Sequence, residues 1–186
     1  MLIYYVLRLR THKQGRGQQM LFDLNDEHSI KVVGDFLSGV RSAGKSIGLT
    51  SGRFDLIHFY HFSFFLRCRR SCDILIVGVD VDEMVRADKG PSRPIIPDFQ
   101  RVIMVDALRP VSFSFIMNNV QDFGRAAEIL QPDIIFKNQD FEGKEDTILG
   151  HEHAQRIVIL RDQLSHHSTT DIIREASKES GRPSSG

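Results

Sequence analysis

This sequence has few cysteines, no net charge and no long hydrophobic run. Only two of its 186 residues are cysteine, Cys68 and Cys72, and Lys plus Arg equals Asp plus Glu at 24 each. No second cysteine pair is present to complete a zinc site, and low cysteine use favours a reducing, intracellular setting. The balanced charge gives no support for a nucleic-acid or membrane-surface partner. The C-x-x-x-C spacing predicts that both thiols lie on one face of a helix.

The apolar segment at the start of the sequence, Met1 to Leu7, is short. It is far below the roughly 20 residues that a membrane helix needs. No basic region precedes it and no small-residue cleavage site follows it. We therefore expect no secretory signal and no membrane span, and we expect a soluble, cytoplasmic protein.

Five short apolar runs alternate with segments of helical spacing. The runs cover residues 47–50, 74–79, 111–116, 133–136 and 156–160. Such alternation predicts an α/β fold, a Rossmann-like doubly wound parallel sheet of about five strands in three α/β/α layers. We expect one domain over residues 25–178, preceded by an extension of unknown role (1–24). A Ser/Gly/Pro-rich segment (179–186) follows, for which we expect disorder.

The most informative stretch follows the first of these runs. Ser51 and Gly52 end the predicted strand and allow a tight turn. His58 and His61 come next, and an apolar-rich segment predicts a helix that starts near His61. A helix start offers unpaired N–H groups and partial positive charge, and imidazoles add donors. The stretch therefore predicts a phosphate-binding site.

The same stretch, Gly52-x-Phe54-Asp55-x-x-His58-x-x-His61, resembles the H-x-G-H signature of the cytidylyltransferase-like nucleotidyltransferases. Four further blocks follow in the family's order, at residues 89–94, 100–101, 137–140 and 167–173. The resemblance covers roughly residues 45–176 and is strongest to the heptose-phosphate adenylyltransferase branch. Cytidylyltransferase relatives carry an Arg where this chain has Gln163, which also favours the adenylyltransferase branch.

The resemblance implies three groups of site residues, which are carried over motif by motif. It assigns catalysis to His58, His61 and Lys89. It assigns nucleotide binding to Ser51, Gly52, Phe54, Asp140, Ser168 and Thr169. It assigns the acceptor's phosphate to Arg93 and Arg101, and Asp82, which follows the second run at the same edge, could also touch the acceptor. Two residues have alternative roles: Arg101 could brace the loop by salt bridges, and we expect Asp55 to hold the turn rather than to do chemistry.

The implied reaction transfers a nucleoside monophosphate, AMP from ATP in the favoured interpretation, to a phosphorylated sugar or similar acceptor. Mg²⁺ would bind mainly through the nucleotide phosphates, with no dedicated metal cage in the protein. One alternative is a cytidylyltransferase that acts on glycerol or alcohol phosphate with CTP. Another is a degenerate nucleotide-binding or scaffold protein, because Tyr60 replaces the motif glycine. Family members are often homodimers, and the resemblance allows the same for this chain.

Overall fold

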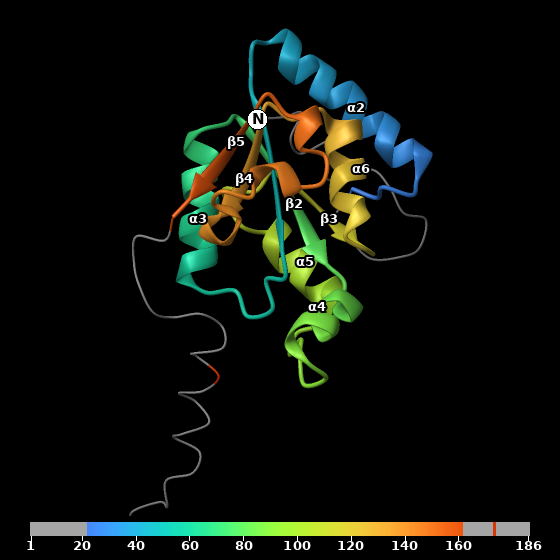
Figure 1. Ribbon diagram of the computed structural model, residues 1–186. Coiled ribbons are helices and arrows are strands. Elements are labelled where there is room, and N and C mark those ends of the chain that lie inside the picture. Colours follow the sequence, from blue (N-terminus) through green and yellow to red (C-terminus); the bar gives the residue numbers. More distant parts are fainter. Residues whose placement is uncertain (1–21, 162–172, 174–186) are drawn as a thin grey trace, which may run out of the picture.

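The computed structural model describes residues 22–161 and residue 173. Ser168, Thr169, most of the extension (1–21) and the tail (179–186) lie outside the described residues. The described chain is built around one parallel sheet with helices on both faces (Figure 1).

Five strands form the sheet in the order β3-β2-β1-β4-β5, and every neighbouring pair is parallel. The strands are β1 (Ile47–Gly52), β2 (Ile74–Asp80), β3 (Phe113–Met117), β4 (Ile134–Asn138) and β5 (Arg156–Leu160). The chain runs from β1 outward to β3 and then returns to the other side of β1, so the strand order reverses between β1 and β4. In open α/β sheets, ligands bind outside the carboxyl ends of the strands at such a reversal.

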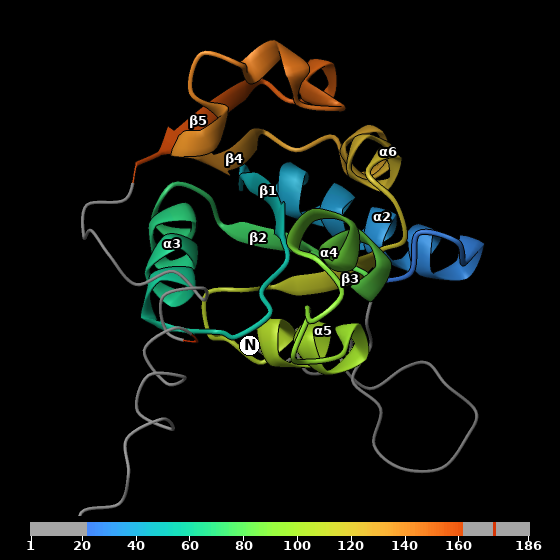
Figure 2. The same cartoon turned by 60° about the horizontal axis from the view of Figure 1, so that its bottom comes forward.

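The helices cover both faces of the sheet. The α2 helix (Glu27–Ser42) and α6 (Gln121–Leu130) pack on one face, and α3 (Phe59–Arg70) and α5 (Asp98–Asp106) pack on the other (Figures 1 and 2). The short α4 (Asp82–Lys89) follows β2 at the carboxyl edge, and 3-10 turns occupy Gln139–Phe141, Glu145–Thr147 and His151–His153. This three-layer arrangement confirms the Rossmann-like fold that the alternating pattern predicts.

Each face of the sheet has its own buried core, because side chains alternate along a strand. Leu49 and Ile76 belong to the core under α2 and α6, and Val77 and Phe136 belong to the core under α3 and α5. Two residues before the expected start of the domain, Phe22 and Leu24, are also buried in the first core. The Phe22 amide donates to the Ser114 carbonyl at 3.1 Å, so this segment lies beside the edge strand β3.

Two local expectations are corrected around α3. The helix begins at Phe59 rather than at His61, and His58 is its N-cap residue. The same helix ends at Arg70, so Cys72 lies beyond it rather than on a shared helix face. Cys72 is nevertheless close to Cys68, because its thiol donates to the Cys68 carbonyl at 3.4 Å. Among the described residues, no helix is long and apolar enough to cross a membrane.

Candidate active site

His58 and His61 lie against each other where α3 begins. Their ring centroids are 4.1 Å apart with an interplanar angle of 33°. Burial and the nearby His58 lower the pKa of His61 to about 4, although the Leu56 backbone acts in the opposite direction. His61 is therefore neutral at pH 7. Its Nδ1 atom is buried and has no hydrogen-bond partner in the part of the chain that is described.

Tyr60, at the position of the motif glycine, borders the histidine pair. Its ring lies edge-on to the His58 ring at a centroid distance of 5.7 Å. The centroid of the Phe59 ring is 6.1 Å from that of the Tyr60 ring. An aromatic ring therefore lies beside His58 at the position where the family motif has a glycine.

The end of β1 is shaped by Gly52 and Phe54. A Cβ atom at Gly52 would lie 2.9 Å from the Phe54 ring, so the chain needs glycine there. Phe54 itself has a positive φ of 49°, which is uncommon for a residue with a side chain. Its ring is buried against Phe65 and His61, with centroids 5.1 Å and 5.3 Å away. The side chain expected to contact nucleotide therefore packs inward and supports His61 instead.

Lys137 is enclosed at the carboxyl end of β4 and reaches across to β1. Its Nζ atom donates to the Ser51 hydroxyl at 2.9 Å and lies 3.8 Å from the Phe123 ring centroid. Only 8% of the residue is exposed. Burial lowers the pKa of Lys137 to about 8, and Asp80 acts in the opposite direction. The Lys137–Ser51 hydrogen bond thus links the two strands between which the strand order reverses.

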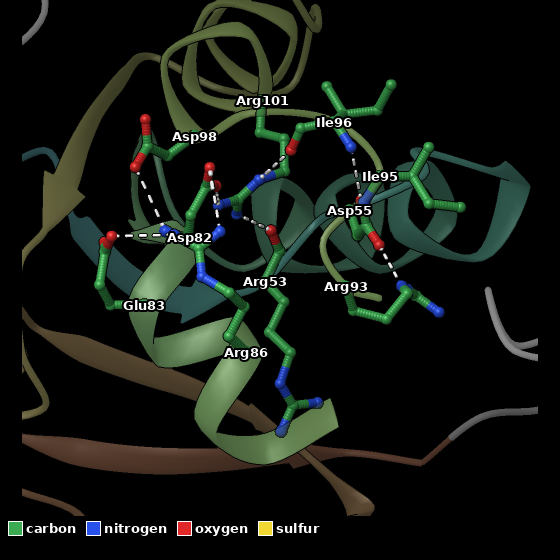
Figure 3. A network of polar contacts seen from close by, with 10 residues as sticks. All are labelled: Arg53, Asp55, Asp82, Glu83, Arg86, Arg93, Ile95, Ile96, Asp98 and Arg101. Atoms are coloured by element: carbon green, nitrogen blue, oxygen red, sulfur yellow. Dashed lines mark hydrogen bonds and ion pairs between the residues drawn. The ribbon is translucent and has the colours of Figure 1, made fainter. Parts of the chain in front are cut away.

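Asp55 holds the loop that follows α4. Its carboxylate accepts the amides of Ile95 and Ile96 at 2.7 Å and 3.0 Å, and the Arg93 Nε atom donates to it at 2.5 Å (Figure 3). Asp55 is 3% exposed, and the Arg93 side chain is 14% exposed. The structure therefore supports the expected turn-holding role of Asp55. The same contact fixes where Arg93 lies.

Arg101 braces the same loop. Its side chain is fully buried and donates to the Ile96 carbonyl at 2.8 Å, to the Arg53 carbonyl, and to Asp82 Oδ1 at 2.8 Å (Figure 3). A guanidinium spent on protein oxygens cannot also hold an acceptor phosphate in this conformation. The structure thus favours the bracing alternative for Arg101, with Asp82 as its partner.

Lys89 ends α4 and belongs to an exposed group of charges. Its Nζ atom lies 3.4 Å from Asp88, and Arg53 is 2.6 Å from the same carboxylate. Asp140 lies further along the edge, where its carboxylate accepts from the Asn138 amide at 2.8 Å. The segments that end or follow β1, β2 and β4 thus carry six of the predicted site residues: Ser51, Gly52, His58, His61, Lys89 and Asp140.

Two charged residues at this edge, Asp80 and Lys137, were not among the site residues predicted from the sequence. Lys137 lies inside a matching block, and Asp80 is the last residue of β2. The signal was available in both cases, since each is a charge that closes an apolar run. Arg53 is a third such residue, because it lies inside the motif at a variable position and approaches the same edge.

The chain also contains the sequence pattern of a P-loop, but its place in the fold excludes that function. Residues 39–46 read G-x-x-x-x-G-K-S, the pattern of a phosphate-binding P-loop. A P-loop joins a strand to a following helix, but here Gly39 lies inside α2 and β1 comes afterwards. Lys45 pairs with Asp73 at 2.9 Å near the amino end of the sheet, away from the candidate site.

No group of three or more His, Cys, Asp or Glu side chains that could hold a metal ion occurs among residues 22–161. A hard cation such as Mg²⁺ does not need such a group if nucleotide phosphates and water supply the oxygens.

Comparison with known proteins agrees with the fold and the motif. The family described as Cytidylyltransferase-like matches residues 49–175. The bifunctional protein HldE of Desulfatibacillum aliphaticivorans is 39% identical over 145 residues, which are 75% of this chain and 28% of that protein. The HldE protein of a Nitratiruptor species is 34% identical over 150 residues, 81% of this chain and 31% of that protein. This chain thus spans less than a third of each relative's length.

A solved structure shows the same fold. The lipopolysaccharide core biosynthesis protein of Thermoplasma volcanium aligns with a TM-score of 0.53 at 20% identity, covering 67% of this chain and 99% of that one. At this identity the likeness concerns the fold alone.

Proposed function

We propose, on the premise that this chain belongs to the cytidylyltransferase-like family, that it transfers a nucleoside monophosphate from a nucleoside triphosphate to a phosphorylated acceptor. The proposed donor is ATP and the proposed acceptor is a sugar phosphate. The single observation that carries the proposal is the contact between His58 and His61 where α3 leaves the carboxyl end of β1. The HldE relatives and the resemblance of the five motif blocks support the same reaction class.

In the proposed reaction, a phosphate oxygen of the acceptor attacks the α-phosphorus of the nucleotide. A new P–O bond forms there as the bond to the β-phosphate breaks, and pyrophosphate leaves in line. No general base is needed, because the acceptor phosphate is already ionised. Negative charge that develops at the α-phosphate would be stabilised by N–H donors that the fold positions beforehand.

His58 and His61 are the proposed donors. Because His61 is neutral at pH 7, it places no charge against the His58 ring. Lys89 and Arg93 would add positive charge from the α4 end of the site, and Ser168 and Thr169 would bind the leaving phosphates. Mg²⁺, held by the triphosphate, would supply further charge neutralisation.

The test is release of pyrophosphate by the full chain with Mg²⁺. ATP and CTP are each crossed with sugar, glycerol and ethanolamine phosphates. We expect release with ATP that depends on one class of sugar phosphate. Release only with CTP and glycerol phosphate would replace the proposed substrates. Absence of release with every pair, together with no thermal stabilisation by either nucleotide, would replace the enzyme by a scaffold.

Replacement of His58 tests whether the histidine pair contributes to the proposed reaction. His58→Ala should lower kcat about 100-fold, as expected when a donor to the transition state is lost. The matched control is His28→Ala on the exposed side of α2, which should keep wild-type turnover. Full turnover of a folded His58→Ala protein would contradict the role assigned to this residue.

A further inference from the structure

Asp80 and Lys137 lie on the two strands that flank β1. Asp80 closes β2 and Lys137 belongs to β4, and β1 pairs with both strands. Lys137 also reaches Ser51 of β1 through its 2.9 Å hydrogen bond. The two charges therefore stand on either side of the central strand, at the edge where the strand order reverses.

Asp80 has an unusual environment for a half-buried carboxylate. Its side chain accepts no hydrogen bond and forms no ion pair in the described part of the chain. It is nevertheless surrounded by charges that act from a distance: Arg53, Lys137 and Arg101 are positive, and Asp88 is negative. Burial raises the pKa of Asp80 and these three cations lower it. A mostly buried carboxylate without a partner leaves hydrogen-bonding capacity unused at a free-energy cost.

Lys137 has donor capacity left on the opposite side. An ammonium carries three N–H donors, and the Ser51 hydroxyl takes one of them. The Phe123 and Phe141 rings lie 3.8 Å and 5.1 Å from Nζ at their centroids, which attracts the cation but gives it no acceptor oxygen. A strong donor and a strong acceptor thus influence each other without being in direct contact.

The opposite charges of Asp80 and Lys137 determine which chemical group could bind to both side chains. A phosphate oxygen is disfavoured by the Asp80 carboxylate, and an ammonium group is disfavoured by Lys137. A divalent cation is disfavoured by the positive charges of Arg53, Lys137 and Arg101, which act on Asp80 from a distance. A hydroxyl group fits, because it can donate to the carboxylate and accept from the ammonium at the same time.

We propose that Asp80 and Lys137 together bind a hydroxyl group of the acceptor, so that the acceptor is a polyhydroxylated phosphate rather than an amino-alcohol phosphate. This inference rests on the proposed function, because it assigns a subsite within the same carboxyl edge. The nucleotide would occupy the His58 side of that edge, and the acceptor's carbon chain would lie over the end of β1. Ser51, held by Lys137, would then lie next to both substrates.

The experiment measures binding of acceptors to the full chain by calorimetry, without nucleotide. The probes are hexose and heptose phosphates, the deoxy forms of the best binder, glycerol phosphate and ethanolamine phosphate. Asp80→Asn and Lys137→Met are compared with Asp35→Asn and Lys31→Met, an exposed pair on α2 whose Nζ and carboxylate are 3.1 Å apart. Thermal unfolding verifies that each variant is folded.

We expect the wild-type chain to bind a sugar phosphate, and each site variant to weaken that binding by about tenfold or more. Removal of the contacted hydroxyl should weaken wild-type binding by about tenfold, but should change binding to Asp80→Asn by less than about twofold. In turnover assays the site variants should raise KM for the acceptor and leave KM for ATP unchanged. The two α2 variants should bind like wild type.

Three results would overturn the inference. One is an equal loss for the deoxy acceptor in wild type and Asp80→Asn, which would mean that only water joins the two charges. Another is tighter binding of ethanolamine phosphate than of any sugar phosphate. The third is the absence of binding by every polyhydroxylated phosphate. Asp80-dependent binding without pyrophosphate release would leave this inference standing and would refute the proposed function instead.

Discussion

Tyr60 is the residue that most directly tests how the histidine pair is reached. Its ring lies edge-on to the His58 ring at a centroid distance of 5.7 Å, so it neighbours His58 without stacking on it. We therefore expect Tyr60→Gly to change the Kd for ATP by less than about threefold. The variant should also lose about 1 kcal/mol of stability, because glycine disfavours a helix. Calorimetric titration with ATP gives the Kd and thermal unfolding gives the stability.

The matched variant for this residue is Tyr60→Phe, which keeps the ring beside His58. It should bind ATP like wild type. A gain of tenfold or more in ATP affinity for Tyr60→Gly, and not for Tyr60→Phe, would mean that the ring blocks the site. That outcome would favour a protein whose nucleotide site has degenerated.

Among the elements, the loop between α4 and α5 depends on a carboxylate from outside it. Asp55 accepts both the Ile95 and the Ile96 amides and also holds Arg93. Asp55→Asn removes the buried negative charge beside Arg93, so we expect the free energy of unfolding to fall by about 3 kcal/mol. Urea denaturation measures that loss. Hydrogen exchange should show faster exchange at the Ile95 and Ile96 amides.

The control for the loop is a carboxylate of the same type at the surface. Asp35 pairs with Lys31 on α2, and the two side chains are 71% and 73% exposed. Asp35→Asn should therefore cost less than about 0.5 kcal/mol and leave exchange at the loop amides unchanged. Equal losses for both variants would show that the Asp55 contacts do not hold the loop.

At the scale of the whole molecule, His61 makes stability depend on pH. The pKa of His61 is about 4 when folded, against 6.5 for an ordinary histidine, so below pH 6.5 the unfolded chain binds a proton that the folded chain excludes. The free energy of unfolding should fall as the pH drops from about 6.5 to about 4 and lose about 3 kcal/mol from this residue. Carboxylates titrate in the same range, so the measurement is the difference between wild type and His61→Gln.

We expect His61→Gln to be less sensitive to pH in urea denaturation between pH 6.5 and pH 4. His28→Gln, at an exposed position of α2, should follow the wild-type curve. Parallel curves for wild type and His61→Gln would mean that the pKa of His61 is the same in the folded and the unfolded chain. Burial would then not keep the imidazole unprotonated below pH 6.5.

The sheet could be predicted from the sequence because buried parallel strands are written as continuous apolar runs. The second run, residues 74–79, differs from β2 (Ile74–Asp80) by one residue. The brace around Arg101 could not be predicted in the same way. Its oxygen partners, on Arg53, Asp82 and Ile96, come from three segments that meet only when the sheet and α5 are assembled.

The sequence predicted the part of the candidate site that lies in one continuous stretch. It did not predict the contacts between residues of separate strands. His58 and His61 are three residues apart, so their proximity follows from local spacing. Lys137 and Ser51 come from β4 and β1, and their hydrogen bond depends on the order of the strands. Phe54 matched the motif, yet its ring is buried because the turn at positive φ directs it inward.

Chemical modification of Cys68, which lies in α3, and of Cys72, just beyond its end, would report the motion of that helix. Both thiols are buried, and burial raises the pKa of each, that of Cys72 to about 11, so neither is reactive in the closed protein. A thiol reagent can attack them only when α3 separates from the sheet, because the thiolate is the reacting species and must be reached by solvent. Since His58 is the N-cap of α3 and His61 lies in its first turn, the rate of alkylation measures how often the helix that positions these two imidazoles opens. Any ligand that bridges His58 and His61 to the sheet would therefore lower the rate at which the two thiols are alkylated.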